Sequence, residues 1–129
     1  LDQIGGDDAV RPPFPQTPDG LLPFGADTRG LYRSLIGLRR RFNWIVDAVP
    51  TTSDLTDESV VVLVTGPEQV IELALNISEA DGPMPEGEIL LASPGCDATV
   101  PPHGWAIGVR PRNETDVPYL PRENRVPAP

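Results

Sequence analysis

Seventeen prolines determine where this 129-residue chain can form regular structure, because proline breaks helices and cannot donate a hydrogen bond in the middle of a sheet. Five of them lie in the first 23 residues, and five lie from Pro111 onward. Segments with this many prolines and no hydrophobic periodicity cannot form a core of their own. We therefore expect residues 1–26 to be an extended loop and residues 113–129 to be a proline-rich tail, with the folded part between them.

One helix is predicted, over residues 27–42. Asp27 or Thr28 can accept a hydrogen bond from the first free amides of that segment. The basic residues at 39–41 fall in the last turns, where positive charge stabilises the exposed carbonyl groups. Apolar residues recur at helical spacing and form a stripe: Leu31, Leu35 and Leu38.

After this helix the hydrophobic pattern changes to a period of two, which is typical of β-strands. The pattern predicts strands over residues 44–49, 60–65, 70–77, 88–93, 99–100 and 104–110. Turn residues separate them about every ten positions, a spacing typical of antiparallel sandwiches. The predicted fold class is therefore mainly β, an antiparallel β-sandwich preceded by one α-helix and an extended proline-rich loop.

The charge of the chain argues against two classes of partner. The net charge is −9, and all ten basic residues are arginine. Nucleic acids and anionic membranes bind concentrated positive charge, so we expect neither as a partner. Half of the arginines lie between positions 29 and 41, which we interpret as the solvated face of the helix. No apolar stretch reaches about 18 residues, so no membrane span is expected.

The sequence predicts no metal site and no cofactor. Cys96 is the only cysteine, so it forms no internal disulfide and has no second thiol beside it to bind a metal. The single histidine, His103, follows two prolines and is expected in a surface turn. Phosphate-loop, dinucleotide and nucleophile-elbow motifs do not occur. Localisation is open, because the chain begins with neither an initiator Met nor a signal peptide; a lone reduced cysteine slightly favours the cytoplasm.

Acidic pairs and tryptophans are the remaining candidates for sugar chemistry. Asp7-Asp8 and Asp57-Glu58 are adjacent pairs, but adjacent side chains on an extended chain point in opposite directions, so we predict no catalytic pair. Trp44 and Trp105 could stack on sugars; each lies among apolar neighbours in a predicted strand, which favours packing in the core.

Three segments in order along the chain resemble the α-amylase family of glycoside hydrolases, in particular its α-glucosidase-like branch. Gly5-Gly6-Asp7-Asp8-Ala9-Val10-Arg11-Pro12-Pro13-Phe14-Pro15 resembles the loop after the eighth strand of the catalytic barrel. Leu31-Tyr32-Arg33-Ser34-Leu35-Ile36-Gly37-Leu38-Arg39-Arg40-Arg41-Phe42-Asn43-Trp44 is similar to the last barrel helix, with Asn43 where the family usually has proline. Val100-Pro101-Pro102-His103-Gly104-Trp105-Ala106-Ile107 is similar to the closing strand of the family's C-terminal domain.

The resemblance implies a division into barrel and β-domain. Residues 1–43 would be the end of a (β/α)8 barrel, and residues 44–112 a Greek-key-like C-terminal sandwich. The parent enzyme would hydrolyse or transfer α-glucosidic bonds with retention, acting on an α-glucan or α-glucoside. Its catalytic carboxylates lie on earlier barrel strands, so this chain would hold no catalytic residue and be inactive alone. Arg11 would line the sugar site, with Asp7 and Asp8 shaping its rim.

A second interpretation stays open: a stand-alone, non-catalytic β-sandwich module that binds glycan or protein. An exposed aromatic pair would favour it, whereas two buried tryptophans would count against it. In either case we expect the helix stripe to be covered, by the missing N-terminal barrel or by a self-associating copy, because an exposed apolar stripe promotes association. The resemblance does not distinguish hydrolase, isomerase and transferase members.

Overall fold

The computed structural model describes residues 16–17, 25–117 and 119, which belong to two compact units divided between Arg41 and Phe42. The described chain is mainly β, with a helix followed by a five-stranded antiparallel sheet and a small second sheet. This confirms the predicted fold class, which is mainly β with one helix before the antiparallel sheet. None of the described helices is long and apolar enough to cross a membrane.

The predicted helix is confirmed as α2, Gly25–Arg41. It includes Asp27 and Thr28, so the expectation that one of them caps its start is wrong. Asp27 lies in its first turn, and Arg39, Arg40 and Arg41 lie in its last turn, so the charges at both ends complement the helix dipole. No α2 residue is buried.

The strand predicted over residues 44–49 is wrong. A short 3-10 helix, η2, spans Asn43–Val46, and the first strand begins only at Pro50. The amide of Ile45 donates to the carbonyl of Phe42 at 3.0 Å, and the rings of Phe42 and Trp44 meet edge to face with their centroids 6.2 Å apart. Trp44 also lies on Gly66, where an added Cβ would be 2.6 Å from the indole. This aromatic packing overrides the β-propensity of the residues that follow.

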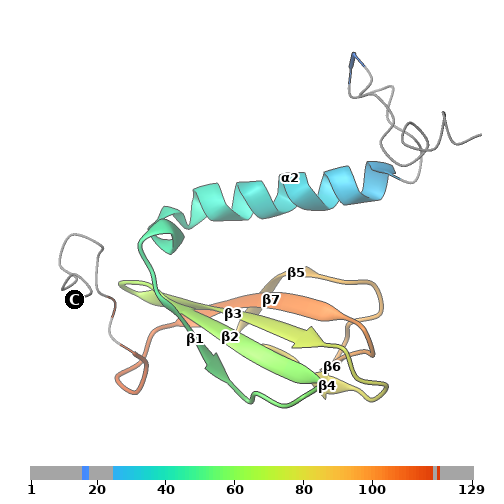
Figure 1. The fold of residues 1–129 in the computed structure, drawn as a ribbon. Helices are drawn as coiled ribbons and strands as arrows, with labels where there is room; N and C mark the ends of the chain where they lie inside the picture. The colour runs from blue at the N-terminus through green and yellow to red at the C-terminus, as the bar shows by residue number, and fades with distance from the viewer. Residues whose placement is uncertain (1–15, 18–24, 118, 120–129) are drawn as a thin grey trace, which may run out of the picture. The chain divides into compact units, whose positions relative to one another are not determined.

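The main sheet has the strand order β1-β2-β3-β7-β5, and every neighbouring pair is antiparallel (Figure 1). The last strand therefore lies inside the sheet, between β3 and β5. Its members are β1 Pro50–Ser53, β2 Ser59–Thr65, β3 Gln69–Asn76, β5 Glu88–Ala92 and β7 Trp105–Pro111. The strands predicted between residues 60 and 110 are confirmed to within a residue at each end, whereas β1 was not predicted.

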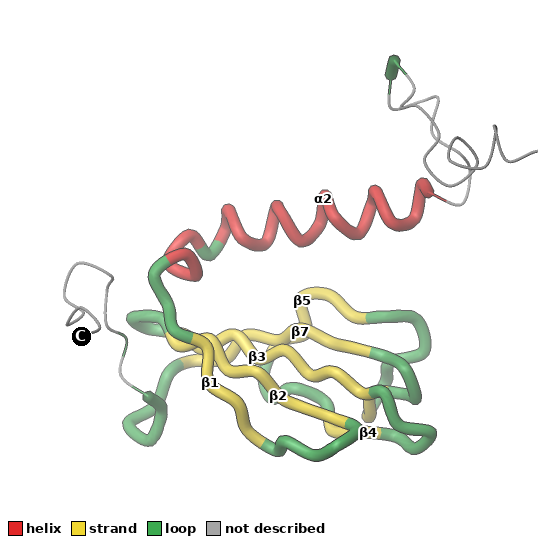
Figure 2. The backbone as a smooth tube through the Cα atoms, viewed as in Figure 1, coloured by secondary structure: helices red, strands yellow, loops and turns green. Residues whose placement is uncertain are grey.

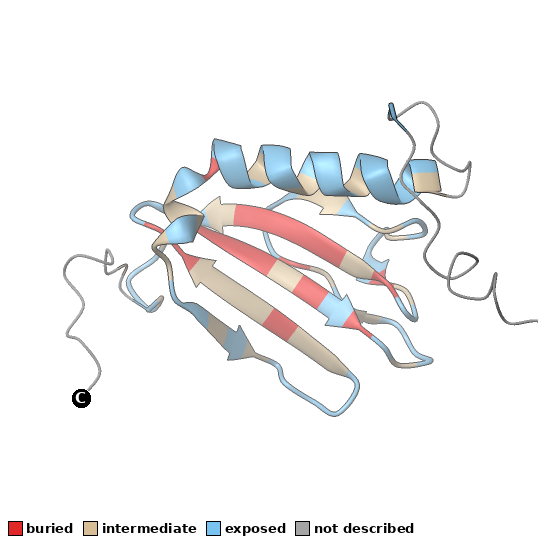
Figure 3. Cartoon of the chain, turned by 45° about the horizontal axis from the view of Figure 1, so that its top comes forward, coloured by how far each residue is buried: buried red, intermediate tan, exposed pale blue. Residues whose placement is uncertain are grey.

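The second sheet is small and consists of β4, Gly82–Pro83, and β6, Thr99–Val100. The first lies in the connection from β3 to β5, and the second in the connection from β5 to β7 (Figure 2). Val100 is fully buried and packs with Val61, Ala74 and Ala106. These three residues are paired across β2, β3 and β7, so the small sheet covers one face of the main sheet at its centre. The buried residues follow these central strands (Figure 3).

Asn76 ties the small sheet to the end of β3. Its side chain is 3% exposed, and its amide nitrogen donates to the carbonyls of Ala80 at 2.8 Å, Val100 at 3.1 Å and Pro101 at 3.1 Å. The amide oxygen accepts from the backbone and the hydroxyl of Ser78. One buried side chain therefore satisfies carbonyl groups from two separate connections.

Candidate functional site

The residues predicted to line a sugar site, Arg11, Asp7 and Asp8, lie outside the part of the chain that the structure describes. Their proposed role therefore stays a prediction. Among the described residues, charged groups are buried together at one place, where Glu72 of β3 meets Arg110 of β7.

Glu72 lies on the central strand of the main sheet, on the face that the small sheet covers. Its cross-strand partners are Leu63 and Gly108, and its side chain is only 9% exposed. Gly108 makes room for Pro85, because a Cβ at position 108 would lie 2.9 Å from the Cβ of Pro85. In this apolar setting the Nε of Arg110 donates to the Oε1 of Glu72 at 2.7 Å.

Arg110 also holds the segment that follows β7. Its Nη1 and Nη2 donate to the two carboxylate oxygens of Asp116 at 2.8 and 2.7 Å, and the amide of Asn113 donates to Asp116 as well. Asp116 is as buried as Glu72, with 7% of its side chain exposed. The first residues of the segment predicted as a tail are therefore fixed to the sheet by a charged clamp that consists of Glu72, Arg110 and Asp116.

The clamp shifts the titration of its members. The hydrogen bonds from Arg110 lower the pKa of Asp116 to about 2, against the opposing effect of burial, and the backbone amide of Asn113 adds to the lowering. The pKa of Arg110 is raised, first by its hydrogen bonds to Asp116 and then by Glu72. Both shifts stabilise the charged forms.

Asp116 should make the folded state sensitive to acid. Its pKa is about 2 when folded against an ordinary value of 3.8, so its contribution is complete above about pH 4 and is lost as the pH falls toward 2. We expect Asp116→Asn to lower the free energy of unfolding by about 1–2 kcal/mol at pH 7, since the clamp borders solvent, and by almost nothing near pH 2. Urea unfolding at several pH values measures this.

Asp97→Asn is the matched control, because Asp97 is exposed and its carboxylate accepts no hydrogen bond from the part of the chain that the structure describes. Its unfolding free energy should follow that of the parent chain at every pH. A deficit for Asp116→Asn that stays constant from pH 7 to pH 2 would contradict the assignment.

A cleft of about 260 Å³ opens beside Glu72 and Arg110. Val61, Leu63 and Met84 form its apolar side. Three carboxylates line it, the buried one of Glu72 and the exposed ones of Asp54 and Glu86. We call this the Glu72 cleft. It combines a desolvated charge, an apolar wall and enough space for a small group, the features of a binding pocket.

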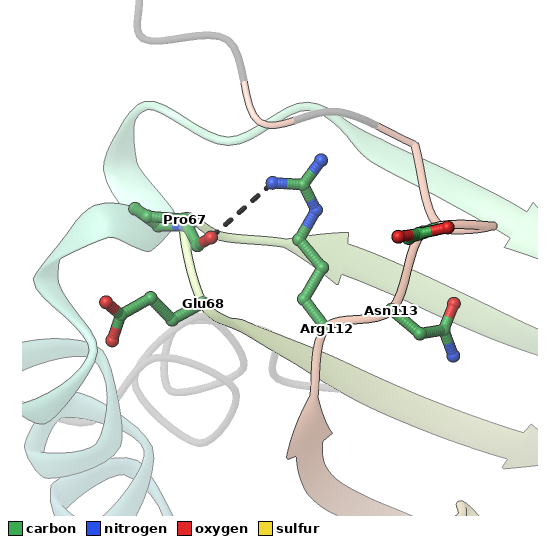
Figure 4. Close-up of a pocket in the computed structure, with 5 residues that line it drawn as sticks. Pro67, Glu68, Arg112 and Asn113 are labelled. Carbon is green, nitrogen blue, oxygen red and sulfur yellow. Dashed lines mark hydrogen bonds between the residues drawn. The ribbon is translucent and has the colours of Figure 1, made fainter.

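A wider hollow of about 430 Å³ lies where the turn between β2 and β3 meets the segment after β7 (Figure 4). Arg112 reaches across it, and its Nη1 donates to the carbonyl of Pro67 at 3.4 Å. Glu68 points away from that guanidinium in Figure 4, and the carboxylate is exposed. Because its polar groups are largely solvated, this hollow has less binding potential than the Glu72 cleft.

The other residues considered from sequence behave as surface or packing groups. His103 is exposed in a turn, as predicted, and its Nε2 lies 2.7 Å from the Oε1 of Glu79. Asp57 and Glu58 are exposed in a loop. Cys96 is a half-buried free thiol. Within residues 25–117, no three metal-binding side chains gather at one place.

The two tryptophans do not form a common sugar platform. Trp105 pairs with Leu75 near the end of β3, whereas Trp44 lies on Gly66, just before the start of that strand. The length of this eight-residue strand, roughly 25 Å, therefore separates them. Both are half-buried, so each contributes to packing more than to an exposed surface.

Sequence reasoning missed the members of the clamp. Glu72 alternates with Ile71 and Leu73, a pattern that suggests a solvent-facing polar position, yet Glu72 is buried. The only signal was a single charge on each of two otherwise apolar strand segments, and their partnership depends on the register of β3 with β7. No model of a known protein family matches the chain, and no curated protein sequence matches it.

Proposed function

We propose that this chain is the C-terminal part of an α-amylase-family glycoside hydrolase that hydrolyses or transfers α-glucosidic bonds with retention. The observation that carries the proposal is the order of its parts. The helix α2 overlaps the segment that resembles the last barrel helix, and an antiparallel β-unit follows it directly. The segment that resembles the family's closing strand leads into β7, which lies between β3 and β5 in the main sheet.

In this proposal the chain supplies support and one wall of the sugar pocket, and the catalytic carboxylates come from upstream. Arg11 would donate hydrogen bonds to a terminal sugar hydroxyl, because a guanidinium presents several donors in a fixed plane, and Asp7 and Asp8 would shape the rim. Apolar side chains of α2 are exposed, Tyr32 at 62% and Ile36 at 50%, and this favours a second surface that packs against the helix. The upstream barrel would provide that surface, or a second copy of this chain would.

The alternative of a stand-alone glycan-binding module has less support. Such modules stack sugars on neighbouring aromatic rings, and here the two tryptophans are half-buried and separated by the length of β3. The enzyme-part proposal needs no such platform.

Hydrolysis of a chromogenic α-glucoside tests the proposal, first with this chain alone and then with the chain joined to its upstream barrel. We expect activity only in the joined protein. There, Arg11→Ala should lower kcat/KM by about ten- to a hundredfold, because it removes charged hydrogen bonds to the sugar. Arg112→Ala is the control and should leave kcat/KM unchanged. A folded joined protein without activity would contradict the proposal.

A further inference from the structure

We propose that the Glu72 cleft binds an organic cation, an ammonium or guanidinium group on a short aliphatic stem. This inference does not depend on the proposed glycosidase function. It rests on the hydrogen bonding of Glu72, on the hydrogen bonds that the Arg110 guanidinium donates away from the cleft, and on the apolar wall of the cleft.

Glu72 has an unused acceptor in a desolvated place. Its Oε1 accepts from Arg110, whereas no donor to its Oε2 is found among the described residues. The side chain is more than nine-tenths buried and lines the cleft. A buried carboxylate oxygen without a donor is unfavourable, and a charged donor that enters the cleft would satisfy it.

Arg110 directs its Nη donors away from the cleft, so hydrogen-bond acceptors predominate there. Its Nη1 and Nη2 are directed to Asp116, and Nη1 also donates to the carbonyl of Pro111. The charge of Arg110 is thus shared with a carboxylate that does not line the cleft. The other polar side chains that line the cleft are the carboxylates of Glu72, Asp54 and Glu86 and the hydroxyl of Ser53. Such a site repels anions and favours a ligand that carries both donors and positive charge.

The apolar wall of the cleft favours a ligand whose charged group is attached to an aliphatic stem. Val61 is buried, and Leu63 and Met84 are partly buried beside the core, so they present methyl and methylene surface to the cleft. A stem of about four carbons could pack on this surface while its charged end meets Glu72, as the stems of arginine and lysine do on protein surfaces. The volume of about 260 Å³ accommodates a group of this size.

Two sources could supply this chemistry. One is a free small molecule such as a diamine, and the other is an arginine side chain of a second copy of this chain, which holds ten arginines and no lysine. Both sources present the same kind of cationic group to the cleft, and they are distinguished by whether the chain is a monomer or a dimer.

Calorimetric titration of the full chain tests the cleft directly. The probes are agmatine and 1,4-diaminobutane, with 1,4-butanediol and methyl α-glucoside as neutral counterparts of similar size. We expect saturable binding of the cations and at least about tenfold weaker binding of the neutral probes, because only a cation gains a charged hydrogen bond to Glu72. Sedimentation in parallel distinguishes the sources: a monomer that binds agmatine supports a free cation, and a dimer that agmatine dissociates supports an arginine of a second copy.

The variants locate the binding. Glu72→Gln should weaken agmatine binding by about tenfold or more, and Asp54→Asn and Glu86→Gln by several-fold each. Glu68→Gln removes an exposed carboxylate outside the cleft and should change nothing. The two rim variants decide the question if Glu72→Gln does not fold. Equal binding of agmatine and butanediol, unchanged affinity in the rim variants, or no cation binding by a monomeric chain would each overturn the proposal.

Discussion

Replacing Arg110 with methionine is expected to lower the free energy of unfolding of the β-unit by about 3 kcal/mol. Methionine keeps much of the volume and the apolar contacts of the arginine stem. It removes both side-chain donors to Asp116, which keeps only the backbone amide of Asn113, and it removes the only donor to the Glu72 carboxylate among the described residues. Two carboxylates would then be buried without a counter-charge, which is far more costly than the loss of an exposed ion pair. Urea unfolding followed by tryptophan fluorescence measures the change, because Trp44 and Trp105 both lie in this unit.

Arg112→Met is the matched control, since this guanidinium donates one long hydrogen bond to a carbonyl, forms no ion pair with a carboxylate of the described residues, and acts on Asp116 through its charge alone. Its free energy of unfolding should stay within about 0.5 kcal/mol of the parent value. Adding Glu72→Leu to Arg110→Met should restore part of the loss, because it removes one stranded charge. Equal, small effects of the two arginine substitutions would show that the clamp does not support the fold.

The spacing of apolar residues and the position of turn residues predicted the helices and strands that depend mainly on local sequence. The apolar stripe and the basic last turn were enough to find α2, and alternation between turn signals found β2, β3, β5, β6 and β7. The exception at Trp44 is informative. Ile45 and Val46 favour a strand by themselves, but the contacts of Trp44 with Phe42 and Gly66 decide the backbone there, and no local pattern contains the last of these contacts.

The clamp and the Glu72 cleft depend on contacts that a linear sequence does not display. Glu72 and Arg110 are 38 positions apart, and they meet because β7 pairs with β3 rather than with β5 alone. Alternation showed correctly that Glu72 and Ile71 face opposite ways. It could not show that connections between the strands cover the face of Glu72, so a polar position that looked solvated is buried.

Asn76→Asp is the second substitution with a large expected effect, a loss of about 3 kcal/mol at pH 7. The change preserves shape but replaces an amide that donates to three carbonyls with a carboxylate that cannot donate. Because the site is 3% exposed, the new charge would face carbonyl oxygens of Ala80, Val100 and Pro101 with little water to screen it. Chemical unfolding at pH 7 measures the loss, and the register of the small sheet should be the first structure affected.

Asn113→Asp provides the control, because the side-chain oxygen of Asn113 only accepts, from the amide and hydroxyl of Thr115, and a carboxylate can accept in the same way. Its effect should stay within about 0.5 kcal/mol. The sign of the pH dependence separates the two variants further. Burial among acceptors raises the pKa of an aspartate at position 76 in the folded state, so its deficit relative to the parent should grow as the pH rises above about 4 and shrink in acid, where the neutral acid regains a donor. A deficit at position 76 that does not change with pH would mean that lost packing, and not the reversal of donor and acceptor, is the cause.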